Sequence, residues 1–569
     1  MHESDPIELL PTGEPASAAP VANPDVLVVG AGPVGLALAV ELARRGIPHR
    51  LIDRNTDPTT HSRALGTQAR TVEVLGLMGI PESALEPAVH ITAFTVLDGR
   101  ESLARIEIDI RAPDRFFDGL LVMTQGDTER VLGERLTALG GRIERGVSLV
   151  GLAQNGAGIV AELQTPEGTE AARPRFVVGC DGAGSTVRRR LGLEFAGDIY
   201  PQEFLLADCR IDWERPRNEG FAWVHPGGLF ATLPLPDPGY WRIVVASAVS
   251  DDASEQLSLE CFARIFAERT GQSPTLTDAR WMSRFRINHR MADHFSVGRV
   301  FLAGDAAHVH SPLGAQGMNT GIQDSFNLGW KLALAARGHA APGLLDTYSE
   351  ERAPVARAVV DATDRGMRLV MAANPALRWV RDRVVTRVAN RQLGRAILAE
   401  AISQLSVNYR RSSLSVGERR GFDSASPRPG DRAPFAGALL LPEETPIDLG
   451  VFMAEGSWTL LLFADPARPL ASASEHAALA ARIVESLGDL VRPLIVLQRG
   501  APPEPRAWST PTLLDSRDEL RARYGVEGEA VALIRPDGYI GYRAAPVRDQ
   551  PLWAYLGRVF HPELLPAAG

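Results

Sequence analysis

The stretch that decides the fold reads VFLAGDAAH over residues 300–308 and continues as PLGAQGMN over residues 312–319. The apolar run at its start is typical of a strand buried on both faces of a parallel sheet. Asp305 comes where that strand ends, and the small residues after it allow backbone N–H groups to approach a bound molecule closely. A helix is expected to follow towards Trp330, with its positive end facing the same place. The pattern predicts a ligand site at one edge of an α/β sheet.

A phosphate-binding turn is predicted near the start of the chain, where residues 30–35 read GAGPVG between an apolar run and a helical stretch. Gly30, Gly32 and Gly35 permit a tight turn that places a pyrophosphate at the N-terminus of the helix. Asp53 follows about 20 residues later, where a carboxylate can accept hydrogen bonds from an adenosine ribose. This βαβ unit on its own does not distinguish NAD from FAD.

A third motif helps to separate the two cofactors. Residues 176–179 (FVVG) predict another buried strand, which leads into Asp181. Alone, this motif is also compatible with a surface turn that caps a helix at Thr186. In chain order with the two stretches above, it favours FAD. Asp305 is then placed to bind the ribityl hydroxyl groups, and residues 312–319 can approach the O2 and N1 edge of the flavin ring.

The composition limits the class of protein. The chain has 569 residues, 45% of them hydrophobic and 23% charged, which is ordinary for a globular protein of two or three domains. Its net charge of -9 argues against nucleic acid as a partner, because there is no basic excess to neutralise phosphates. No apolar run approaches the roughly 18 residues that a membrane helix needs. The cysteines Cys180, Cys209 and Cys261 form no C-x-x-C pair, which fits a reduced, cytoplasmic enzyme.

The chain is expected to alternate between two kinds of sheet. From residue 203 to residue 249, short runs are broken by turn signatures such as HPGG at residues 225–228, which predicts an antiparallel meander. A linker rich in Pro, Gly and Ser at residues 424–431 precedes a separate αβ module. The predicted order is a disordered tail at residues 1–24, an FAD-binding domain at 25–200 with some substrate-sheet strands near 91–120, a substrate domain at 201–295, the rest of the FAD-binding domain with a helical segment at 296–423, and the αβ module at 430–569.

Three further features accompany these motifs: RALGTQAR at residues 63–70, Gln125, and LDTYSEER at residues 345–352. In this combination the chain resembles the single-component FAD-dependent aromatic hydroxylases, which are class A flavoprotein monooxygenases. It is most similar to bacterial hydroxylases of polyketides and phenolic compounds that carry a C-terminal thioredoxin-like domain, and the resemblance covers residues 25–543. It implies an α/β fold with a Rossmann-type FAD-binding domain, an inserted antiparallel-sheet substrate domain, and a thioredoxin-like C-terminal domain that lacks the redox cysteines.

The resemblance also implies which residues bind FAD. Gly30, Gly32 and Gly35 would bind the pyrophosphate, and Asp53 the adenosine ribose. The other contacts implied are Arg54 beside the adenosine, Arg63 at the phosphates, Gln125 at the ribityl side, the backbone of Leu149 at the adenine, Asp181 in the crevice where FAD and NAD(P)H are handled, Asp305 at the ribityl chain, and Met318 and Asn319 at the isoalloxazine ring.

The reaction implied by the resemblance is that of an NAD(P)H:oxygen monooxygenase. NADH or NADPH docks transiently and reduces FAD, and oxygen then gives a C4a-hydroperoxyflavin that transfers a hydroxyl group to a phenolic or polyketide-like aromatic molecule. The site must exclude water meanwhile, which the inserted sheet can do. The expected partners are the aromatic small molecule and molecular oxygen, with a homodimer as one expected assembly and with neither nucleic acid nor membrane involved.

Other functions stay open on the sequence alone. The same fold and cofactor could insert oxygen next to a ketone, in Baeyer–Villiger chemistry, or epoxidise an alkene. A non-catalytic flavin-binding component of a biosynthetic complex is a further alternative, whereas disulfide redox chemistry is not expected without a C-x-x-C pair. No metal is expected either, because His308 and His310 lack a third ligand nearby. His308 is instead expected to form a structural hydrogen bond.

Candidates for the substrate face lie mainly in the predicted meander. Trp223 and His225 share one face by period-two alternation, and Phe230 follows in the next expected strand. Arg286, ahead of the last FAD strand, could bind a phenolate or a carboxylate. Core packing is the alternative for the aromatic residues, and a surface ion pair for Arg286. No catalytic residue is assigned, because this chain has Leu65 where the phenol hydroxylase subgroup places an acid near the flavin.

Overall fold

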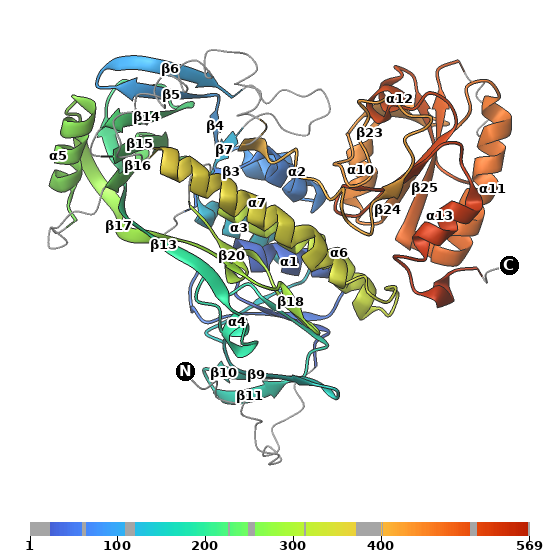
Figure 1. Cartoon of the computed structure of the whole chain (residues 1–569), viewed down its shortest axis with the longest axis horizontal. Coiled ribbons are helices and arrows are strands. Elements are labelled where there is room, and N and C mark those ends of the chain that lie inside the picture. The colour runs from blue at the N-terminus through green and yellow to red at the C-terminus, as the bar shows by residue number, and fades with distance from the viewer. Residues whose placement is uncertain are drawn as a thin grey trace.

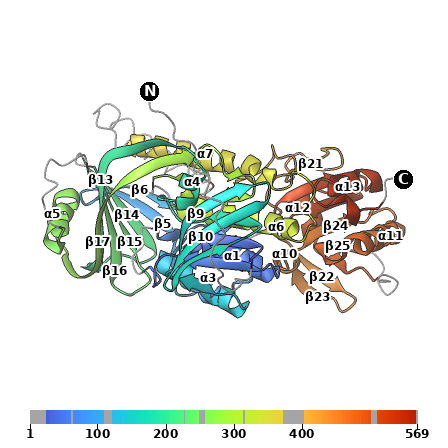
Figure 2. The ribbon, with the colours of Figure 1, turned by 90° about the horizontal axis from the view of Figure 1, so that it is seen from below.

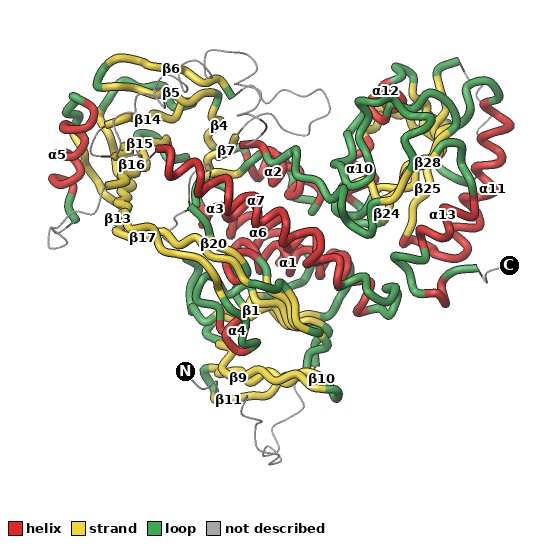
Figure 3. The backbone as a smooth tube through the Cα atoms, in the orientation of Figure 1, coloured by secondary structure: helices red, strands yellow, loops and turns green. Residues whose placement is uncertain are grey.

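The computed structural model describes residues 23–59, 64–108, 120–225, 228–247, 257–311, 315–370, 400, 402–500 and 509–566. Over these residues the chain forms three parts that lie in a row (Figure 1, Figure 2). A mostly antiparallel sheet stands at one end, a parallel sheet with its helices in the middle, and a C-terminal domain at the other end, as the distribution of helices and strands in Figure 3 shows. Most of the predicted N-terminal tail lies outside the described residues.

The central sheet is six-stranded, with every neighbouring pair parallel except the pair at one edge. Its middle strands are apolar and fully buried, as the sequence predicts for a sheet covered on both sides. In sheet order the strands are β18 (Ser296–Val297), β19 (Val300–Leu302), β12 (Phe176–Gly179), β1 (Val26–Val29), β2 (His49–Asp53) and β8 (Ile143–Arg145). A separate three-stranded meander consists of β9 (Ser148–Asn155), β10 (Gly158–Thr165) and β11 (Gly168–Ala172).

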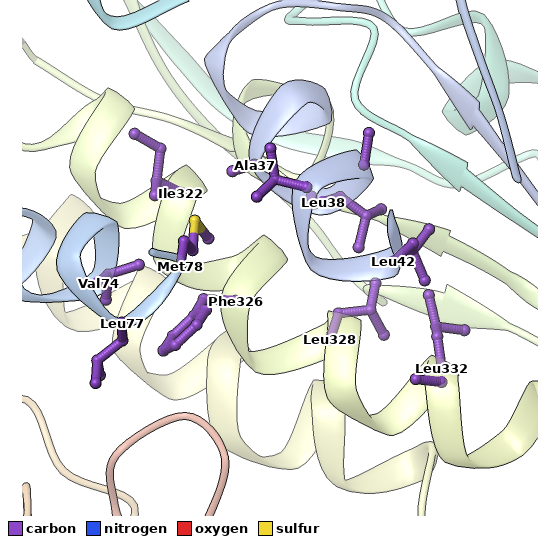
Figure 4. Close-up of a cluster of buried hydrophobic side chains, with 14 of the residues drawn as sticks. Ala37, Leu38, Leu42, Val74, Leu77, Met78, Ile322, Phe326, Leu328 and Leu332 are labelled. Atoms are coloured by element: carbon purple, nitrogen blue, oxygen red, sulfur yellow. The ribbon is translucent and has the colours of Figure 1, made fainter. Parts of the chain in front are cut away.

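Helices around this sheet share one hydrophobic core. The helices are α1 (Pro33–Arg44), α2 (Ala69–Leu77), α3 (Gln125–Ala138), α4 (Thr186–Arg190) and α6 (Gly317–Ala336), with the short 3₁₀ turns η1 (Glu82–Leu85) and η2 (Gly304–Ala306). Figure 4 shows α6 packed against α1 and α2 through the side chains of Ala37, Leu38, Leu42, Val74, Leu77, Met78, Ile322, Phe326, Leu328 and Leu332. Burying each large apolar side chain contributes about 1.5–3 kcal/mol. Because α6 is buried on nearly every side, its polar residues need partners inside the protein.

The second sheet has eight strands, and only its β14–β5 pair is parallel. In sheet order the strands are β20 (His308–Val309), β17 (Thr275–Ala292), β13 (Phe195–Asp212), β16 (Tyr240–Ser247), β15 (Gly228–Pro234), β14 (Glu219–His225), β5 (Ala93–Asp98) and β6 (Glu101–Glu107). Helix α5 (Leu259–Thr270) covers one of its faces. A small sheet of β3 (Gly66–Thr67), β7 (Leu120–Val122) and β4 (Val89–Ile91) links it to α2. The edge strand β20 belongs to the same stretch, residues 300–309, as β19 of the central sheet. One segment of backbone therefore contributes to both sheets.

The C-terminal domain is a further eight-stranded sheet with helices. In sheet order its strands are β21 (Val416–Gly417), β28 (Ile540–Ala544), β27 (Ala530–Ile534), β24 (Trp458–Phe463), β25 (Val491–Gln498), β26 (Thr512–Asp515), β22 (Gly437–Leu441) and β23 (Thr445–Asp448). The strands β24, β25 and β26 are mutually parallel, whereas β27 and β28 run antiparallel to their neighbours β24 and β27. Its helices are α10 (Leu449–Ala454), α11 (Pro469–Leu487), α12 (Glu519–Tyr524) and α13 (Asp549–Leu556), with the turns η3 (Gly488–Leu490) and η5 (Pro562–Leu564).

Helix α7 (Asp346–Val370) spans the molecule (Figure 1). Near its C-terminal end, Met367 packs with Phe204 of the antiparallel sheet. Near its N-terminal end, Glu351 bonds to Arg535 of the C-terminal domain. One helix therefore contacts all three parts of the fold. Within the described residues, no helix combines the length and the hydropathy that crossing a membrane requires.

Candidate active site

The turn after β1 leaves room for a phosphate. Gly30 has a φ of +103°, which favours glycine, and a Cβ there would lie 2.5 Å from the carbonyl oxygen of Cys180. A Cβ at Gly35 would lie 1.8 Å from the carbonyl oxygen of Gly30, so both positions need glycine for packing. At Gly32, the N-cap residue of α1, a Cβ would meet nothing within 4 Å. This open space in front of a helix N-terminus fits the pyrophosphate of a dinucleotide.

Asp53, the last residue of β2, is fixed by two backbone groups. Its Oδ2 accepts a hydrogen bond from the N–H of Ala31 at 2.7 Å, and its Oδ1 accepts one from the N–H of Asn55 at 2.8 Å. The carboxylate therefore ties the end of β2 to the phosphate turn, and a carboxylate oxygen with one bond can accept another from a ribose hydroxyl. Arg54 follows with an exposed side chain. Arg63 lies outside the described residues.

Gln125 and Leu149 both lie on rigid backbone. Gln125 is the first residue of α3, whose start is closed by reciprocal hydrogen bonds between Thr124 and Asp127. Its Nε2 donates a hydrogen bond to Oε1 of Glu129 at 2.8 Å. Leu149 lies in β9, in the ladder with β10, and its side chain is buried. A fixed backbone is what a preorganised cofactor contact requires.

Asp181 follows β12 and has one carboxylate oxygen to spare. Its Oδ2 accepts hydrogen bonds from the N–H groups of Thr186 at 2.6 Å and Val187 at 3.2 Å, at the start of α4. Its Oδ1 is buried and finds no hydrogen-bond partner within the described chain. A buried acceptor of this kind costs free energy unless something donates to it, so it fits a site that a bound molecule completes. The helix-capping role that the isolated motif suggests is present as well.

Asp305 lies in η2, directly after β19, and its side chain is exposed. Gly304 before it has a φ of +60°, and a Cβ there would lie 2.7 Å from a methyl group of Val34 in the first turn of α1. A Cβ on Gly321 of α6 would lie 2.6 Å from the same methyl group. The phosphate turn and the Asp305 turn, far apart in the sequence, therefore meet at one residue of α1. Residues 312–314 of the glycine-rich loop lie outside the described chain.

The side-chain amide of Asn319, near the start of α6, forms hydrogen bonds through both its oxygen and its nitrogen. Its Oδ1 accepts a hydrogen bond from the N–H of Gln68 at 2.9 Å. Its Nδ2 donates to the carbonyl oxygens of Gly66 at 2.8 Å and Ala315 at 2.6 Å. These bonds tie the segment around β3 to the start of α6. Met318 beside it is half-buried.

A buried ionic cluster supports the Asp305 turn, and sequence analysis did not identify it. Asp324 of α6 accepts a hydrogen bond from the N–H of Gly304 at 3.0 Å and lies 2.8 Å from Nε2 of His308. Its other oxygen accepts a hydrogen bond from Nε of Arg352 on α7 at 2.7 Å. Burial would raise the pKa of Asp324, but the charges of Arg352 and His308 outweigh burial and hold that pKa below its ordinary value. The predicted structural hydrogen bond of His308 is confirmed.

His310 lies beside this cluster. In the part of the chain that the structure describes, no three His, Cys, Asp or Glu side chains gather as metal ligands would. The ring of His310 lies parallel to that of His308, with centroids 6.5 Å apart, and its Nδ1 lies 2.8 Å from the carbonyl oxygen of Ser311. Burial lowers the pKa of His310 to about 4, so the ring is neutral at physiological pH.

The antiparallel sheet has an outer face, which α5 covers. Trp223 and Phe230 are 0% exposed there, in a cluster with aromatic residues of α5. His225 shares this side of β14 with Trp223 by alternation. Arg286 is exposed and pairs with a carboxylate of β13 at 3.4 Å. Packing beneath α5 therefore accounts for Trp223 and Phe230, in place of the predicted contact with substrate, because alternation places residues on a common face without saying which face is inner.

The inner face of the same sheet, on the side away from α5, has a hydrophobic cluster at each end. At one end Leu233 packs with Leu65, beside the small sheet. At the other end Leu229 packs with Met367 of α7. Between these two clusters the small side chains are only partly covered. Three of them, Ala222, Ala231 and Ser283, are half-buried.

One buried ion pair lies on this inner face. Asp208 of β13 and Arg242 of β16 are opposite each other in the ladder. Arg242 donates two hydrogen bonds to the carboxylate, each at 2.7 Å. The guanidinium also lies 5.4 Å from the ring centroid of Trp281. Because the two charges compensate each other, the pair adds no net charge to the face.

Known proteins match this chain over most of its length. Residues 23–363 match the FAD binding domain family. The 6-methylpretetramide 4-monooxygenase of Streptomyces rimosus is 37% identical over 530 residues, which cover 91% of this chain and 90% of that protein. The pentachlorophenol 4-monooxygenase of Sphingobium chlorophenolicum is 33% identical over 545 residues, which cover 94% of this chain and 96% of that protein.

Solved structures are similar over the same extent. OxyS, the anhydrotetracycline hydroxylase from Streptomyces rimosus, superposes with a TM-score of 0.74 at 30% identity, covering 95% of this chain and 99% of that one. A ternary complex of aklavinone-11 hydroxylase with FAD and aklavinone also gives a TM-score of 0.74, at 26% identity, covering 94% of this chain and 98% of that one. The chain therefore belongs to the FAD binding domain family, and it is an FAD-dependent monooxygenase that hydroxylates aromatic compounds with NAD(P)H as the reductant.

Proposed function

We propose that this monooxygenase acts on a multi-ring phenolic substrate of the polyketide type, which binds against the inner face of the antiparallel sheet. The observation that carries the proposal is the set of small, half-buried side chains, Ala222, Ala231 and Ser283, between two packed clusters on that face. Flat ring systems bind to broad apolar surfaces with few polar groups. Two of the similar proteins are named for such substrates, 6-methylpretetramide and anhydrotetracycline.

The charge of the wall favours a neutral ring system over an anionic substrate. Asp208 and Arg242 are paired within the wall, so neither offers an uncompensated charge to a ligand. A substrate carboxylate would lose its hydration there without gaining an ionic partner from this pair, which is unfavourable. A phenol or a quinone avoids that cost.

FAD would lie along the edge of the parallel sheet where the three motifs meet. Bound there, it supplies the redox chemistry that activates oxygen. The start of α6, held in place by Asn319, would favour negative charge at the ring edge. The inner face of the antiparallel sheet would exclude water from the ring. The residues proposed to hold FAD are Gly30, Gly32, Gly35, Asp53, Arg54, Arg63, Gln125, Leu149, Asp181, Asp305, Met318 and Asn319.

We also infer that the C-terminal domain is thioredoxin-like in fold but not in chemistry. The order β28-β27-β24-β25 supports this, since its two inner strands are antiparallel and β24 and β25 are parallel. No cysteine occurs in the chain after Cys261, so this domain has no dithiol to oxidise. Its function is then structural.

Anaerobic reduction of the flavin tests the substrate class. The enzyme is mixed with NADH or NADPH, with and without a panel of single-ring phenols and multi-ring phenols and quinones. A multi-ring phenol should accelerate bleaching of the flavin many-fold, and single-ring phenols much less. Equal rates with every ligand and with none would contradict the proposal. Mass spectrometry of the product then separates hydroxylation from Baeyer–Villiger or epoxidation chemistry.

Substitution of Ala231 tests the location of the substrate. Ala231→Phe enlarges one of the half-buried side chains of the inner face and should raise KM for a multi-ring substrate about tenfold or more, because overpacking a contact surface costs about 1–3 kcal/mol. The KM for a small phenol, which needs less of the wall, should change little and serves as the internal control. An unchanged KM for the large substrate would place it elsewhere.

A further inference from the structure

A buried ionic cluster joins the C-terminal domain to α6 and α7. Its charged members are Lys331, Glu351, Arg535 and Asp537, whose side chains are at most 2% exposed. Glu351 accepts hydrogen bonds from Nζ of Lys331 at 2.7 Å and from the two terminal nitrogens of Arg535 at 2.6 and 2.8 Å. Arg535 also pairs with Asp537 at 2.6 Å. Two helices of the central part and the segment after β27 are therefore bound at one point.

The cluster is electrically balanced and depends on every member. Asn327 of α6 donates hydrogen bonds to Glu351 at 2.7 Å and to Asp537 at 3.1 Å. Burial would raise the pKa of Glu351, but the charges of Arg535 and Lys331 hold it far below its ordinary range. Burial lowers the pKa of Lys331 to about 8 despite the opposing effect of Glu351. Removing one charge from such a cluster leaves another buried without compensation.

The neighbouring residue on α7 belongs to the cluster beneath the Asp305 turn. Arg352 directly follows Glu351 on α7. The side chains of both residues, and of the partners Asp324 and Arg535, are 0% exposed. Arg352 bonds to Asp324, and Asp324 accepts the hydrogen bond from the N–H of Gly304. Gly304 directly precedes Asp305 in η2. Of two consecutive residues on one helix, Glu351 therefore bonds to the C-terminal domain, and Arg352 is connected through Asp324 to the turn at the end of β19.

A tyrosine provides a second connection between the two clusters. Tyr409 receives a hydrogen bond from Nη1 of Arg352 at 2.9 Å. The guanidinium of Arg535 lies 5.2 Å from the centroid of the Tyr409 ring. Tyr539 of the C-terminal domain lies against the same ring, with centroids 4.3 Å apart. The two clusters are thus in contact through packed groups as well as through the backbone of α7.

We propose that Arg535 of the C-terminal domain is a positioning residue for the FAD site. It fixes Glu351 on α7, and thereby its neighbour Arg352. Arg352 holds Asp324, which holds the turn that carries Asp305. The inference rests on the proposed contact between Asp305 and FAD. The C-terminal domain then contributes to flavin binding without touching the flavin.

The test compares Arg535→Met with Arg535→Lys in the full-length holoenzyme. Arg535→Met removes the charge, whereas Arg535→Lys keeps it but can make only one of the paired contacts to Glu351. FAD affinity is measured by rebinding to the stripped enzyme, together with the visible circular dichroism and the reduction potential of the bound flavin. We expect Arg535→Met to weaken FAD binding about tenfold and to alter the flavin spectrum. Arg535→Lys should restore part of both.

Leu497→Ala is the matched control. Leu497 is buried in a separate cluster of the C-terminal domain with Ile495 and Ala464. Its truncation should lower the melting temperature while FAD affinity and the flavin spectrum stay near those of the wild type. If Leu497→Ala changes the flavin as much as Arg535→Met does, general destabilisation explains the effect and the proposal is overturned. If Arg535→Met fails to fold, Arg535→Lys answers the same question by the same readouts.

Asp305→Ala separates failure of this proposal from failure of the proposed site. Normal FAD binding by Arg535→Met, with weakened binding by Asp305→Ala, overturns the positioning role alone. Normal FAD binding by Asp305→Ala overturns the contact between Asp305 and FAD, and the positioning role with it. Weakened binding in both, with a normal Leu497→Ala, supports the proposal.

Discussion

The two α/β sheets of this molecule are alike in their central strands and differ at the ends of those strands. The residues of β1 and of β24 are all apolar or nearly so and fully buried. β1 leads into Gly30 and an open space at the start of α1. β24 leads into a loop that is closed by its own groups, where Asp465 accepts a hydrogen bond from the N–H of Ala467 and donates its own N–H to Ser472, both at 3.0 Å.

The proposed FAD site lies on the side of this difference where the strand ends are open. Buried apolar strands specify the architecture in both. In the parallel sheet, β1 leads into Gly30 and an open space, and β12 leads to Asp181, one of whose carboxylate oxygens has no partner in the described chain. The loop after β24 instead pairs its own groups. A strand end that satisfies its own polar groups stabilises the fold and offers nothing to a ligand. Changes at the ends of β1 and β12 should therefore affect FAD binding, and changes in the loop after β24 only stability.

The largest effect is expected from Arg352→Met, beneath the Asp305 turn. It removes one partner of a pair with Asp324 in which both side chains are 0% exposed. Breaking a buried pair on one side costs about 3–5 kcal/mol, because the remaining charge stays buried. Urea unfolding should show this loss, with less flavin bound per chain. The double variant Arg352→Met/Asp324→Asn should recover part of the stability, and wild-type stability in the single variant would contradict the prediction.

A smaller effect, and a sharper distinction, is expected within the phosphate turn. Gly35→Ala forces a Cβ against the carbonyl oxygen of Gly30 and should cost about 1–3 kcal/mol of unfolding free energy in addition to FAD binding. Gly32→Ala places its methyl group in open space and should keep the stability of the apoprotein. Its FAD affinity should still fall, because the methyl group occupies the proposed phosphate position. Equal stability losses in the two variants would contradict this assignment.

The pH dependence of stability should reveal the Asp324 cluster. The pKa of Asp324 is lowered in the folded protein, so its contribution to stability is present above its pKa in the unfolded chain and is lost as the pH falls through the lower folded value. The unfolded value is about 3.9, so the loss should occur below about pH 4. Asp324→Asn should lose less unfolding free energy than the wild type over this range. Parallel curves for the two proteins would contradict the prediction.

The smallest effect is expected at the closed loop after β24. Asp465→Ala removes the acceptor for the N–H of Ala467 and should cost about 0.5–1 kcal/mol, the typical net contribution of one partly exposed hydrogen bond. FAD affinity should equal that of the wild type, because no part of this loop contributes to the proposed site. A change in flavin binding would remove the functional distinction between the two sheets.

The positions of the cofactor motifs could be predicted from the sequence because they depend on local rules. A buried strand followed by glycines, or by an aspartate, has few structural solutions. In the structure β2 ends at Asp53, and Asp181 and Asp305 shortly follow the ends of β12 and β19, as expected. The same holds for the αβ character of the C-terminal module. Each of these predictions depends only on the residues of one continuous segment.

The supporting clusters could not be predicted because burial of a charge is a tertiary property. Glu351 and Arg352 belong to a stretch with the composition of an exposed helical face, yet both are nearly fully buried by α6 and the C-terminal domain. Asp324 and Lys331 lie within α6, and the neighbouring sequence does not indicate that their partners, Arg352 and Glu351, lie on another helix. The side of the sheet that α5 covers could not be predicted for a related reason, because alternation relates Trp223 to its neighbours and not to α5.

The edge strand β20 has a consequence for chimeras and for recombination among related genes. Val309 pairs with Arg290 and His308 with Met291, so the backbone that leaves the Asp305 turn is also a strand of the antiparallel sheet. A slip of one residue in this pairing would turn His308 away from Asp324. A graft of β13 through β17 from a relative should therefore succeed only when the matching β20 segment travels with it. Viable crossovers between related genes are expected outside the segment from β17 to β20. New substrate specificities would then arise mainly by point substitution on the inner face of the antiparallel sheet.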